Sequence, residues 1–428
     1  MNKKKDEKVG IIGLGYVGLP LAVLCAEKGY QVSGCDLDRQ KITSLQKGKS
    51  PLLDKFIEKR SAYLQELSVS TDSEIIQDAD ILIICVPTPV DKYYYPDLKP
   101  VKGAVKSAIK HHKPGRLVIV ESTINPGVCE EVIEPMFSQA GLKEGKDYYL
   151  AHCPERIDPG NKSYDVGNIS RVIGSMSKKG VQRSKNFYES IIDGEIKAMK
   201  FIREAEAVKV VENSFRDINI AFVNELAQSF DQMKIDVKDV IDGAATKPFA
   251  FMAHYPSRGV GGHCIPVDPY YLIEQAKRKG FSHKFLKAAR DINNYMPLYT
   301  VKLLQDLLNE AEMPLKNTRV GIMGLSYKAN IDDLRESPVF KILEELEKKG
   351  AKPIKYDPYI PQDSDVNSVE ELLDQSQALM LITNHQEFQG VEDKLADKSV
   401  KAVVDGMNSL DGEKIKKNGV LYHGIGRG

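Results

Sequence analysis

The feature that most constrains the fold is a glycine-rich turn between an apolar strand and an apolar helix near the start of the chain. The stretch VGIIGLGYVGLP (9–20) places Gly13, Gly15 and Gly18 in this turn, and the next strand, YQVSGCD, ends at Asp36. The first glycine allows a tight turn, the second lets a diphosphate approach the backbone, and the third lets the helix pack on the strand. The whole strand–helix–strand pattern predicts a Rossmann-type dinucleotide site.

The acid that follows the second strand indicates which dinucleotide binds. Asp36 is placed to accept hydrogen bonds from the adenosine ribose, and its charge would repel the additional phosphate of NADP, so NAD is the expected cofactor. Lys41 is a candidate for the same end of the site, although its spacing fits a solvated helix lysine equally well. Tyr16 and Val17, inside the glycine turn, are further candidates for cofactor contacts.

Three more apolar runs, ADILIICVP, GRLVIVEST and DYYLAHCPE, each end at polar groups. These groups include Thr88 after Pro87, then Ser122 and Thr123, and finally Glu155. In a doubly wound sheet, ligands bind beyond the carboxyl ends of the strands, so these residues are expected to converge on one crevice. Taken singly, each could equally be an ordinary turn residue or helix cap.

The first motif has a degenerate copy, since VGIIGLGY (9–16) recurs as VGIMGLSY (320–327). The copy continues into alternating helix and strand patterns and predicts a second α/β domain. Ser326 and Ala329 replace the second and third glycines, and Lys328 adds a charge. We therefore expect this domain to bind a different phosphate-bearing ligand, or to serve only in packing. Its strands are expected at AKPIKYDP, ALMLIT, VKAVVD and GVLYHG.

Between the two copies, residues 203–231 have apolar residues at helical spacing and contain no glycine or proline. The pattern predicts one long helix that joins the domains and could form a dimer interface. Lys209, Asn213 and either Arg216 or Asp217 would share one face of it, which could also be a plain solvated face. The predicted fold class is α/β, with two Rossmann-like doubly wound domains joined by a long central helix. The expected domains are 1–200, 201–312 and 313–428.

A single cysteine lies in a glycine-rich loop, GGHCIPVDP (261–269). Cys264 has His263 beside it and Asp268 four residues later, where a helix begins. A lone cysteine is usually a buried apolar residue, and a redox-sensing thiol is another alternative. Beside NAD, however, a thiol can capture an aldehyde, lose hydride from the thiohemiacetal and give a thioester that water hydrolyses. Asp268 and Lys209 could supply proton transfer and charge stabilisation.

Composition restricts the partners. The 60 basic and 60 acidic side chains cancel, so nothing indicates a nucleic acid or a membrane surface, and a small molecule is the expected ligand. No run of apolar residues is long enough to span a bilayer, and a cytoplasmic protein is expected. The six cysteines include no CxxC pair and predict thiols rather than disulfides or a metal site.

Seven stretches together resemble the UDP-glucose/GDP-mannose dehydrogenase family over nearly the whole chain. They are GLGYVGLP, VPTPV, ESTINPG, PERIDPG, KVVENSFRDINIAFVNELA, GGHCIPVDPYYL and GLSYKANIDDLRESP. The resemblance implies an NAD-binding and a UDP-binding domain joined by a dimerising helix, and thus a homodimer. It also implies four-electron oxidation of the C6 hydroxyl of a UDP-sugar to a carboxylate, with two NAD and one water consumed.

The resemblance also implies roles for individual positions. Cys264 corresponds to the nucleophile that forms the thiohemiacetal and the thioester. The residues implied to stabilise the oxyanion, activate water or lie beside the reacting carbon are Lys209, Asn213, Asp268, Thr123 and Glu155. The implied cofactor contacts include Asp36, Lys41 and Arg335. The implied substrate contacts are Glu155, Arg156, Lys209, Asn213, Tyr255, Arg258, Gly261 and Lys328.

Within the family, PERIDPGN and TKPF look most like the branch that acts on UDP-N-acetylhexosamines for polysaccharide synthesis, with UDP-N-acetylglucosamine as the first choice. UDP-N-acetylmannosamine, UDP-N-acetylgalactosamine and UDP-glucose are alternatives with the same chemistry, and a non-catalytic nucleotide-sugar sensor is a distant one. Two departures bear on this choice. Ser257 and Arg258 stand where relatives often have glycine and proline, and Pro159 stands where the UDP-glucose branch has a glutamate.

Overall fold

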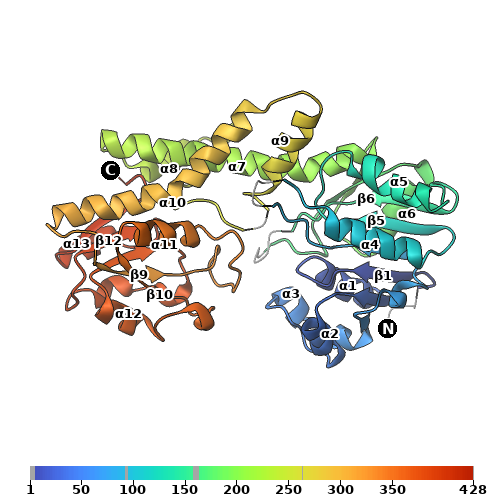
Figure 1. Cartoon of the computed structure of the whole chain (residues 1–428), viewed down its shortest axis with the longest axis horizontal. Helices are drawn as coiled ribbons and strands as arrows, with labels where there is room; N and C mark the ends of the chain where they lie inside the picture. Colours follow the sequence, from blue (N-terminus) through green and yellow to red (C-terminus); the bar gives the residue numbers. More distant parts are fainter. Residues whose placement is uncertain (1–4, 92–94, 158–162, 263, 428) are drawn as a thin grey trace. The chain divides into compact units, whose positions relative to one another are not determined.

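The computed structural model describes residues 5–91, 95–157, 163–262 and 264–427. The chain divides into two compact units (Figure 1). Unit 1 comprises residues 1–212 and 270–281, and unit 2 comprises residues 213–269 and 282–428. The segment 201–312 is thus shared between the units, and its standing as a separate domain stays a prediction.

Unit 1 is built on an eight-stranded sheet with the order β3-β2-β1-β4-β5-β6-β7-β8. The described pairs are parallel except for β6 with β7, which is antiparallel. The strands are β1 (Lys8–Ile12), β2 (Gln31–Cys35), β3 (Ser68–Ser70), β4 (Ile81–Ile84), β5 (Arg116–Val120), β6 (Tyr148–His152), β7 (Arg171–Ser175) and β8 (Ile196–Ala198). The helices are α1 (Gly18–Glu27), α2 (Arg39–Gln46), α3 (Lys55–Glu58), α4 (Lys99–Lys110), α5 (Glu134–Gln139) and α6 (Lys178–Glu189).

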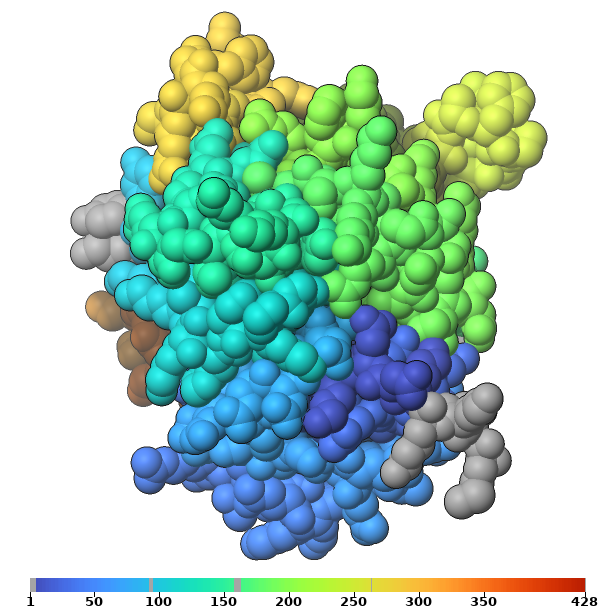
Figure 2. All heavy atoms as spheres, turned by 90° about the vertical axis from the view of Figure 1, so that its right-hand side faces the viewer, coloured from blue at the N-terminus to red at the C-terminus, as the bar shows by residue number. Residues whose placement is uncertain are grey.

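Both faces of this sheet are covered, as a doubly wound fold requires. Along β4, Ile81 and Ile83 pack with α1 and α6, whereas Leu82 and Ile84 pack with α4 and α5. This continuous apolar run is typical of a parallel strand buried on both sides. Figure 2 shows the blue segments, before about residue 80, at one end of unit 1 and the teal and green segments at the other, in keeping with the strand order.

Helix α7 (Ile202–Met233) is one continuous helix (Figure 1), and it passes from unit 1 into unit 2 at Glu212. Its sequence has neither glycine nor proline, so nothing interrupts the backbone ladder. It ends at Met233, because the next residue, Lys234, has a left-handed φ of 55° that cannot continue a helix. The predicted long helix is therefore confirmed.

Unit 2 holds a five-stranded parallel sheet with the order β10-β9-β11-β12-β13. The strands are β9 (Arg319–Met323), β10 (Lys352–Tyr356), β11 (Ala378–Leu381), β12 (Ala402–Asp405) and β13 (Leu421–Gly424). The helices are α8 (Val237–Ala245), α10 (Lys284–Glu310), α11 (Val339–Lys348), α12 (Val369–Gln375) and α13 (Gly412–Lys417), and α9 (Asp268–Arg278) starts in unit 2 and continues in unit 1. One face packs with α10 and α11 and the other with α12 and α13. The predicted α/β class with two Rossmann-like sheets is thus confirmed, and each strand expected from the second copy is present.

Among the described residues, no helix has the length and the apolar character needed to cross a membrane.

Candidate active site

The glycine turn of unit 1 connects β1 to α1, and each glycine has a separate physical reason. Gly13 has φ of 94°, and a Cβ there would lie 2.6 Å from the Cys85 carbonyl oxygen. A Cβ on Gly18 would lie 1.9 Å from the carbonyl oxygen of Gly13. Gly15 has open space around its Cβ position, so backbone can be approached there. The turn therefore fits a diphosphate at the start of a ten-residue helix.

Asp36 follows β2 and is held by several donors. Its carboxylate accepts hydrogen bonds from the Leu14 backbone nitrogen (2.8 Å), the Asp38 backbone nitrogen (3.0 Å) and Lys41 Nζ (2.8 Å). Burial opposes ionisation of Asp36, but these hydrogen bonds outweigh it, and the pKa of Asp36 is lowered. The structure therefore places Lys41 beside Asp36, and these contacts hold the Asp36 carboxylate in its charged form.

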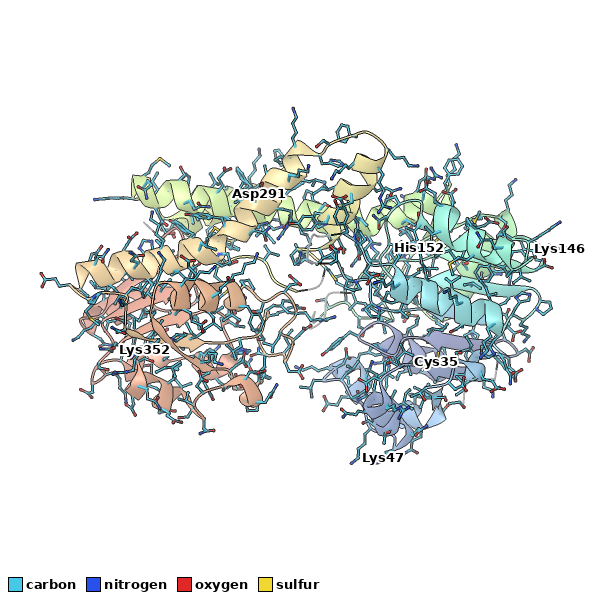
Figure 3. All side chains as sticks on the ribbon, viewed as in Figure 1. Cys35, Lys47, Lys146, His152, Asp291 and Lys352 are labelled. Carbon is cyan, nitrogen blue, oxygen red and sulfur yellow. The ribbon has the colours of Figure 1, made fainter. Side chains whose placement is uncertain are left out.

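The polar groups at the ends of β4, β5 and β6 lie at the carboxyl edge of the same sheet; Figure 3 labels Cys35 and His152, the last residues of β2 and β6. Thr88 and Ser122 are buried, and Thr123 is half-buried. Ser122 Oγ donates to the Val86 carbonyl at 2.7 Å, which ties the β4 and β5 ends together. Pro87 in the same loop is exposed. This edge is where a doubly wound sheet binds its ligand.

A part of α9 is anchored at that edge within unit 1. The Tyr271 hydroxyl donates to the carbonyl oxygen of Thr88, and Asn125 Nδ2 donates to the Tyr271 carbonyl at 3.0 Å. Sequence reasoning missed these contacts, because they join positions far apart in the chain.

Glu155, after β6, points into the protein. Its Oε1 accepts from the backbone nitrogens of Arg156 (2.6 Å) and Ile157 (2.8 Å), and its Oε2 lies 2.7 Å from Arg171 Nη2. The Arg156 side chain is paired with Glu212 and donates to the Ser170 carbonyl at 3.0 Å. Pro159, at the second acidic position of the UDP-glucose branch, lies outside the described residues.

Arg171 belongs to a buried charged cluster that sequence reasoning missed. Its Nη1 lies 3.3 Å from Glu121 Oε2, and the Tyr188 hydroxyl donates to Glu121 Oε1. Arg171 and Glu121 are 0% and 1% exposed, respectively. Because these partners come from β5, β7 and α6, no local spacing signals the cluster.

The polar face of α7 is buried rather than solvated. Lys209, Asn213 and Asp217 are 8%, 4% and 0% exposed, whereas Arg216 lies on the exposed side. Of the two positions that the spacing left open, Asp217 and not Arg216 therefore shares the buried face of α7. Within unit 2, Asp217 is ion-paired with Arg290 and so has a packing role. Burial raises its pKa despite that arginine.

The cysteine loop presents its thiol to solvent. Cys264 is exposed, whereas Cys25, Cys35, Cys85, Cys129 and Cys153 are all buried. Burial raises the pKa of each of those five thiols, to about 11 for Cys35 and about 12 for Cys153. A thiol in an apolar interior is a poor nucleophile, because the nucleophile is the thiolate. The chain therefore offers one accessible thiol.

Asp268 is buried at the first position of α9, four residues after Cys264. The backbone nitrogens of Val267 and Asp268 donate to the Cys264 carbonyl oxygen, which folds the loop into a turn. Asn213 Nδ2 donates to Asp268 Oδ2 at 2.5 Å. Within unit 2, Asp268 therefore contacts both the Cys264 backbone and the Asn213 side chain, and the catalytic roles of the three residues stay a prediction. His263 lies outside the described residues.

Close contacts in unit 2 explain the glycines of this loop. A Cβ on Gly261 or Gly262 would lie 2.7 or 2.8 Å from the Tyr327 side chain, so these glycines serve packing against the second glycine-turn copy. Arg258 is buried, and its Nη2 donates to the Tyr327 carbonyl at 2.8 Å. Tyr255 is half-exposed, and its hydroxyl donates to Asp242. The loop thus packs against the segment that contains Lys328.

The copied turn in unit 2 cannot bind a nucleotide as the first one does. Asp357 follows β10 just as Asp36 follows β2, but it is fully buried, and its Oδ2 accepts from the backbone nitrogens of Leu325 (2.7 Å) and Ser326 (3.0 Å) and lies 3.1 Å from His385 Nε2. The helix after β9 begins at residue 339, 16 residues past the strand end at 323, whereas α1 begins 6 residues past β1. Among the described residues, the segment 324–338 directly after β9 therefore contains no helix start comparable to that of α1.

Two further predicted residues lie in the segment between β9 and α11. Lys328 is half-buried, and its carbonyl oxygen accepts from Ser326 Oγ at 2.9 Å. Arg335 has a half-exposed side chain that pairs with Asp333 at 2.6 Å. The side-chain hydrogen bond to Asp333 raises the pKa of Arg335.

Comparison with known proteins gives a consistent set of family matches over most of the chain. Residues 7–192 match the NAD binding domain of the UDP-glucose/GDP-mannose dehydrogenase family, residues 203–295 match its central domain, and residues 321–412 match its UDP binding domain.

Individual relatives are similar along nearly their full length. The UDP-N-acetyl-D-mannosamine dehydrogenase of Pyrococcus horikoshii is 35% identical over 426 residues, covering 98% of this chain and 99% of that protein. A UDP-N-acetyl-D-glucosamine 6-dehydrogenase of Pseudomonas aeruginosa is 38% identical over 360 residues, covering 83% of this chain and 84% of that protein. The solved structure of the Pyrococcus horikoshii UDP-D-ManNAc dehydrogenase superposes with a TM-score of 0.92 at 34% identity, covering 98% of this chain and 99% of that chain.

Proposed function

This chain belongs to the UDP-glucose/GDP-mannose dehydrogenase family, and on that premise we propose that it oxidises the C6 hydroxyl of a UDP-N-acetylhexosamine to a carboxylate through a thioester on Cys264. The chain is an NAD-dependent oxidoreductase that acts on a UDP-sugar. The observation that carries the proposal is the exposure of Cys264 next to the Asn213–Asp268 pair.

An alcohol must lose four electrons to become an acid, so the proposed reaction would need two NAD molecules, each taking one hydride. The first oxidation gives the C6 aldehyde. The Cys264 sulfur then forms a bond to this carbon, and the carbonyl oxygen takes a proton to give the thiohemiacetal. The second hydride loss gives the thioester. Water adds to it, the carbon–sulfur bond breaks, and the sugar acid and the free thiol are released.

The residues around the reacting carbon have distinct proposed tasks. Lys209 and Asn213 stabilise the negative oxygen that develops on the carbon, because a cation and an amide donor favour that charge where water is excluded. Asp268 accepts the proton from the attacking water or from the thiol, and its hydrogen bond from Asn213 fixes its orientation. Thr123 and Glu155 are proposed to lie beside the hydrolytic water.

The proposed cofactor contacts follow the unit 1 geometry. The glycine turn, with Tyr16 and Val17, binds the diphosphate. Asp36 and Lys41 contact the adenosine ribose, and residues at the ends of β4 and β5 contact the remaining part of the cofactor. The proposed residues of the β4 and β5 ends are Pro87, Thr88, Ser122 and Thr123, and Arg335 is added from the family resemblance. The open space at Gly15 and the ionised Asp36 support this assignment.

The proposed substrate contacts are Arg156, Tyr255, Arg258, Gly261 and Lys328, together with Glu155, Lys209 and Asn213. Lys328 is assigned to the UDP portion. Arg258 stands where relatives often have proline, and its buried guanidinium beside the carbonyl oxygen of Tyr327 makes this loop more cationic than the common pattern.

Two hexosamines have separate support. UDP-N-acetylmannosamine is favoured by the Pyrococcus horikoshii relative, because that match covers nearly all of both chains. UDP-N-acetylglucosamine, the first choice from the sequence, is favoured by the higher identity of the Pseudomonas aeruginosa relative over a shorter match. We propose the N-acetylmannosamine sugar as the first substrate to test and the N-acetylglucosamine sugar as the second. The acid product would enter polysaccharide synthesis.

A panel of nucleotide sugars tests the function. The purified chain is mixed with NAD and with UDP-N-acetylmannosamine, UDP-N-acetylglucosamine, UDP-N-acetylgalactosamine or UDP-glucose, and NADH is followed by absorbance. We expect one N-acetylhexosamine to give a kcat/KM at least about tenfold above the others, since one lost polar contact costs about 1–3 kcal/mol. Sugar isomerisation without NADH would indicate an epimerase. Binding without any turnover would indicate a sensor. Either result would contradict the proposal.

A further inference from the structure

The buried cluster beside Glu155, which consists of Arg171, Glu121 and Tyr188, has no assigned role in the proposed reaction. Arg171, at the start of β7, is fully buried and lies between two carboxylates, Glu155 at 2.7 Å and Glu121 at 3.3 Å. A buried guanidinium is costly unless it is paired, so its position is determined by these acids. Unit 1 contains all three residues.

The contact geometry restricts Glu155 on both oxygens. Oε1 accepts from two successive backbone nitrogens, those of Arg156 and Ile157. Oε2 lies against Arg171 Nη2, but off the direction of a hydrogen bond, so this contact is mainly coulombic. The carboxylate is therefore held by its own turn on one side and by one cation on the other.

Glu121 holds the cation from the opposite side. It follows β5 and accepts from Arg171 Nη1 and from the Tyr188 hydroxyl on α6. Burial raises the pKa of Glu121 to about 7, although Arg171 lowers it. Burial also opposes the charge on Arg171, but Glu155 and Glu121 raise its pKa well above the usual value. The arginine thus stays charged and is shared by two acids.

We propose that Arg171 is a positioning residue, which fixes the Glu155 carboxylate at the end of β6 while Glu121 and Tyr188 hold Arg171 in place. The inference rests on the proposed function, in that Glu155 acts beside the reacting carbon. Arg171 itself is fully buried and acts only through Glu155. If Arg171 were merely part of the core, its removal would lower stability without a specific effect at Glu155.

The chain offers a matched control. Arg116, at the start of β5, is 1% exposed in the same unit, and its guanidinium donates to the carbonyl oxygens of Ile76, Gln77, Ala79 and His111. It lies at the opposite end of the strand that Glu121 follows. Arg116→Met therefore removes a buried arginine from the same sheet without touching the Glu155 turn.

The first measurement is independent of the reaction. Hydrogen exchange of the Arg156 and Ile157 amides reports the two hydrogen bonds to Glu155 Oε1. In Arg171→Met we expect these amides to exchange at least about tenfold faster, since a loss of about 1.4 kcal/mol in local stability is a factor of ten. Arg171→Lys should restore part of the protection, because it keeps the charge. Unchanged protection in Arg171→Met, or an equal change in Arg116→Met, would overturn the inference.

The second measurement is a double-mutant cycle on kcat with the preferred UDP-sugar. Arg171→Met and Glu155→Gln should each lower kcat by about tenfold or more, and the double variant should be no slower than Glu155→Gln alone, because both changes act through one carboxylate. If kcat of the double variant fell by the product of the two single losses, the inference would be overturned. If Arg171→Met does not fold, Arg171→Gln, which also removes the charge, replaces it in both measurements with the same criteria. A wild-type chain that oxidises no UDP-sugar would refute the proposed function, and the exchange measurement would still decide the role of Arg171.

Discussion

An aspartate follows the second strand in both Rossmann-like sheets, but the two aspartates have different surroundings. Asp36 and Asp357 each follow the second strand of a Rossmann-like sheet, and each accepts from the backbone of the preceding turn. Asp36 also has Lys41 beside it and keeps some exposure, whereas Asp357 is fully buried against His385. The environment therefore makes the first acid available to a ligand and uses the second for packing.

The Asp36 assignment gives a prediction at this scale. Asp36→Ala removes the charge that repels a 2′-phosphate and releases Lys41 to pair with it. We expect the ratio of kcat/KM for NAD to that for NADP to fall by about tenfold or more, as expected from a loss of about 1.4 kcal/mol of discrimination. Asp54→Ala is the control, since Asp54 caps α3 in the same unit. An unchanged ratio in Asp36→Ala would refute the assignment.

The candidate site residues that the sequence predicted are those with a local signature. Cys264 stands in a glycine-rich loop and Asp36 at a fixed distance from a glycine turn, so spacing alone located them. Glu121 and Arg171 are 50 positions apart, and each reads alone as the end or start of a strand. Their partnership depends on the antiparallel β7, which no short-range pattern predicted.

At the scale of elements, different glycines in the turn between β1 and α1 serve the packing of the fold and the proposed binding of the cofactor. The Gly18 position is closed by the carbonyl oxygen of Gly13, whereas the Gly15 position is open. The sequence predicted both glycines from one motif, but only the contacts distinguish their tasks. The late start of α11 in the second copy was also not predicted, because the apolar pattern after residue 327 gives no sharp helix start.

Two alanine substitutions test this separation. Gly18→Ala is expected to lower the free energy of unfolding by about 2 kcal/mol, because the methyl group overlaps backbone that cannot move freely. Gly15→Ala is expected to leave stability within about 0.5 kcal/mol, but to weaken NAD binding at least about tenfold by blocking the approach of the diphosphate. Thermal unfolding and calorimetric titration with NAD measure the two effects. Equal stability losses in both variants would contradict this interpretation.

At the scale of the whole molecule, the dimer stays a proposal, which is supported by an apolar surface on α7. Val211, Phe215 and Phe222 are 54%, 48% and 53% exposed on this helix. Exposed large apolar side chains that repeat along one helix are typical of protein–protein contacts. The sequence predicted the helix and that it joins the domains. Which of its apolar residues are exposed could not be predicted, because apolar spacing alone does not distinguish buried positions from exposed ones.

Introducing a charge into the exposed apolar residues of α7 tests the dimer. Phe222→Glu is expected to raise the dissociation constant of the dimer at least about tenfold, since it places a charge in an apolar contact. Phe340→Glu is the control, because Phe340 is 50% exposed on α11. Analytical ultracentrifugation over a range of concentrations gives both constants. A monomeric wild-type chain, or equal effects of the two substitutions, would refute the α7 interface.

Thioester chemistry at Cys264 is tested by measuring how much NADH and how much sugar acid the wild-type chain and Cys264→Ser form from the same UDP-sugar. We expect two NADH for each acid in the wild type, and no acid from Cys264→Ser although its affinity for NAD is retained. Acid production by Cys264→Ser at the wild-type rate would show that no thioester on this sulfur is required.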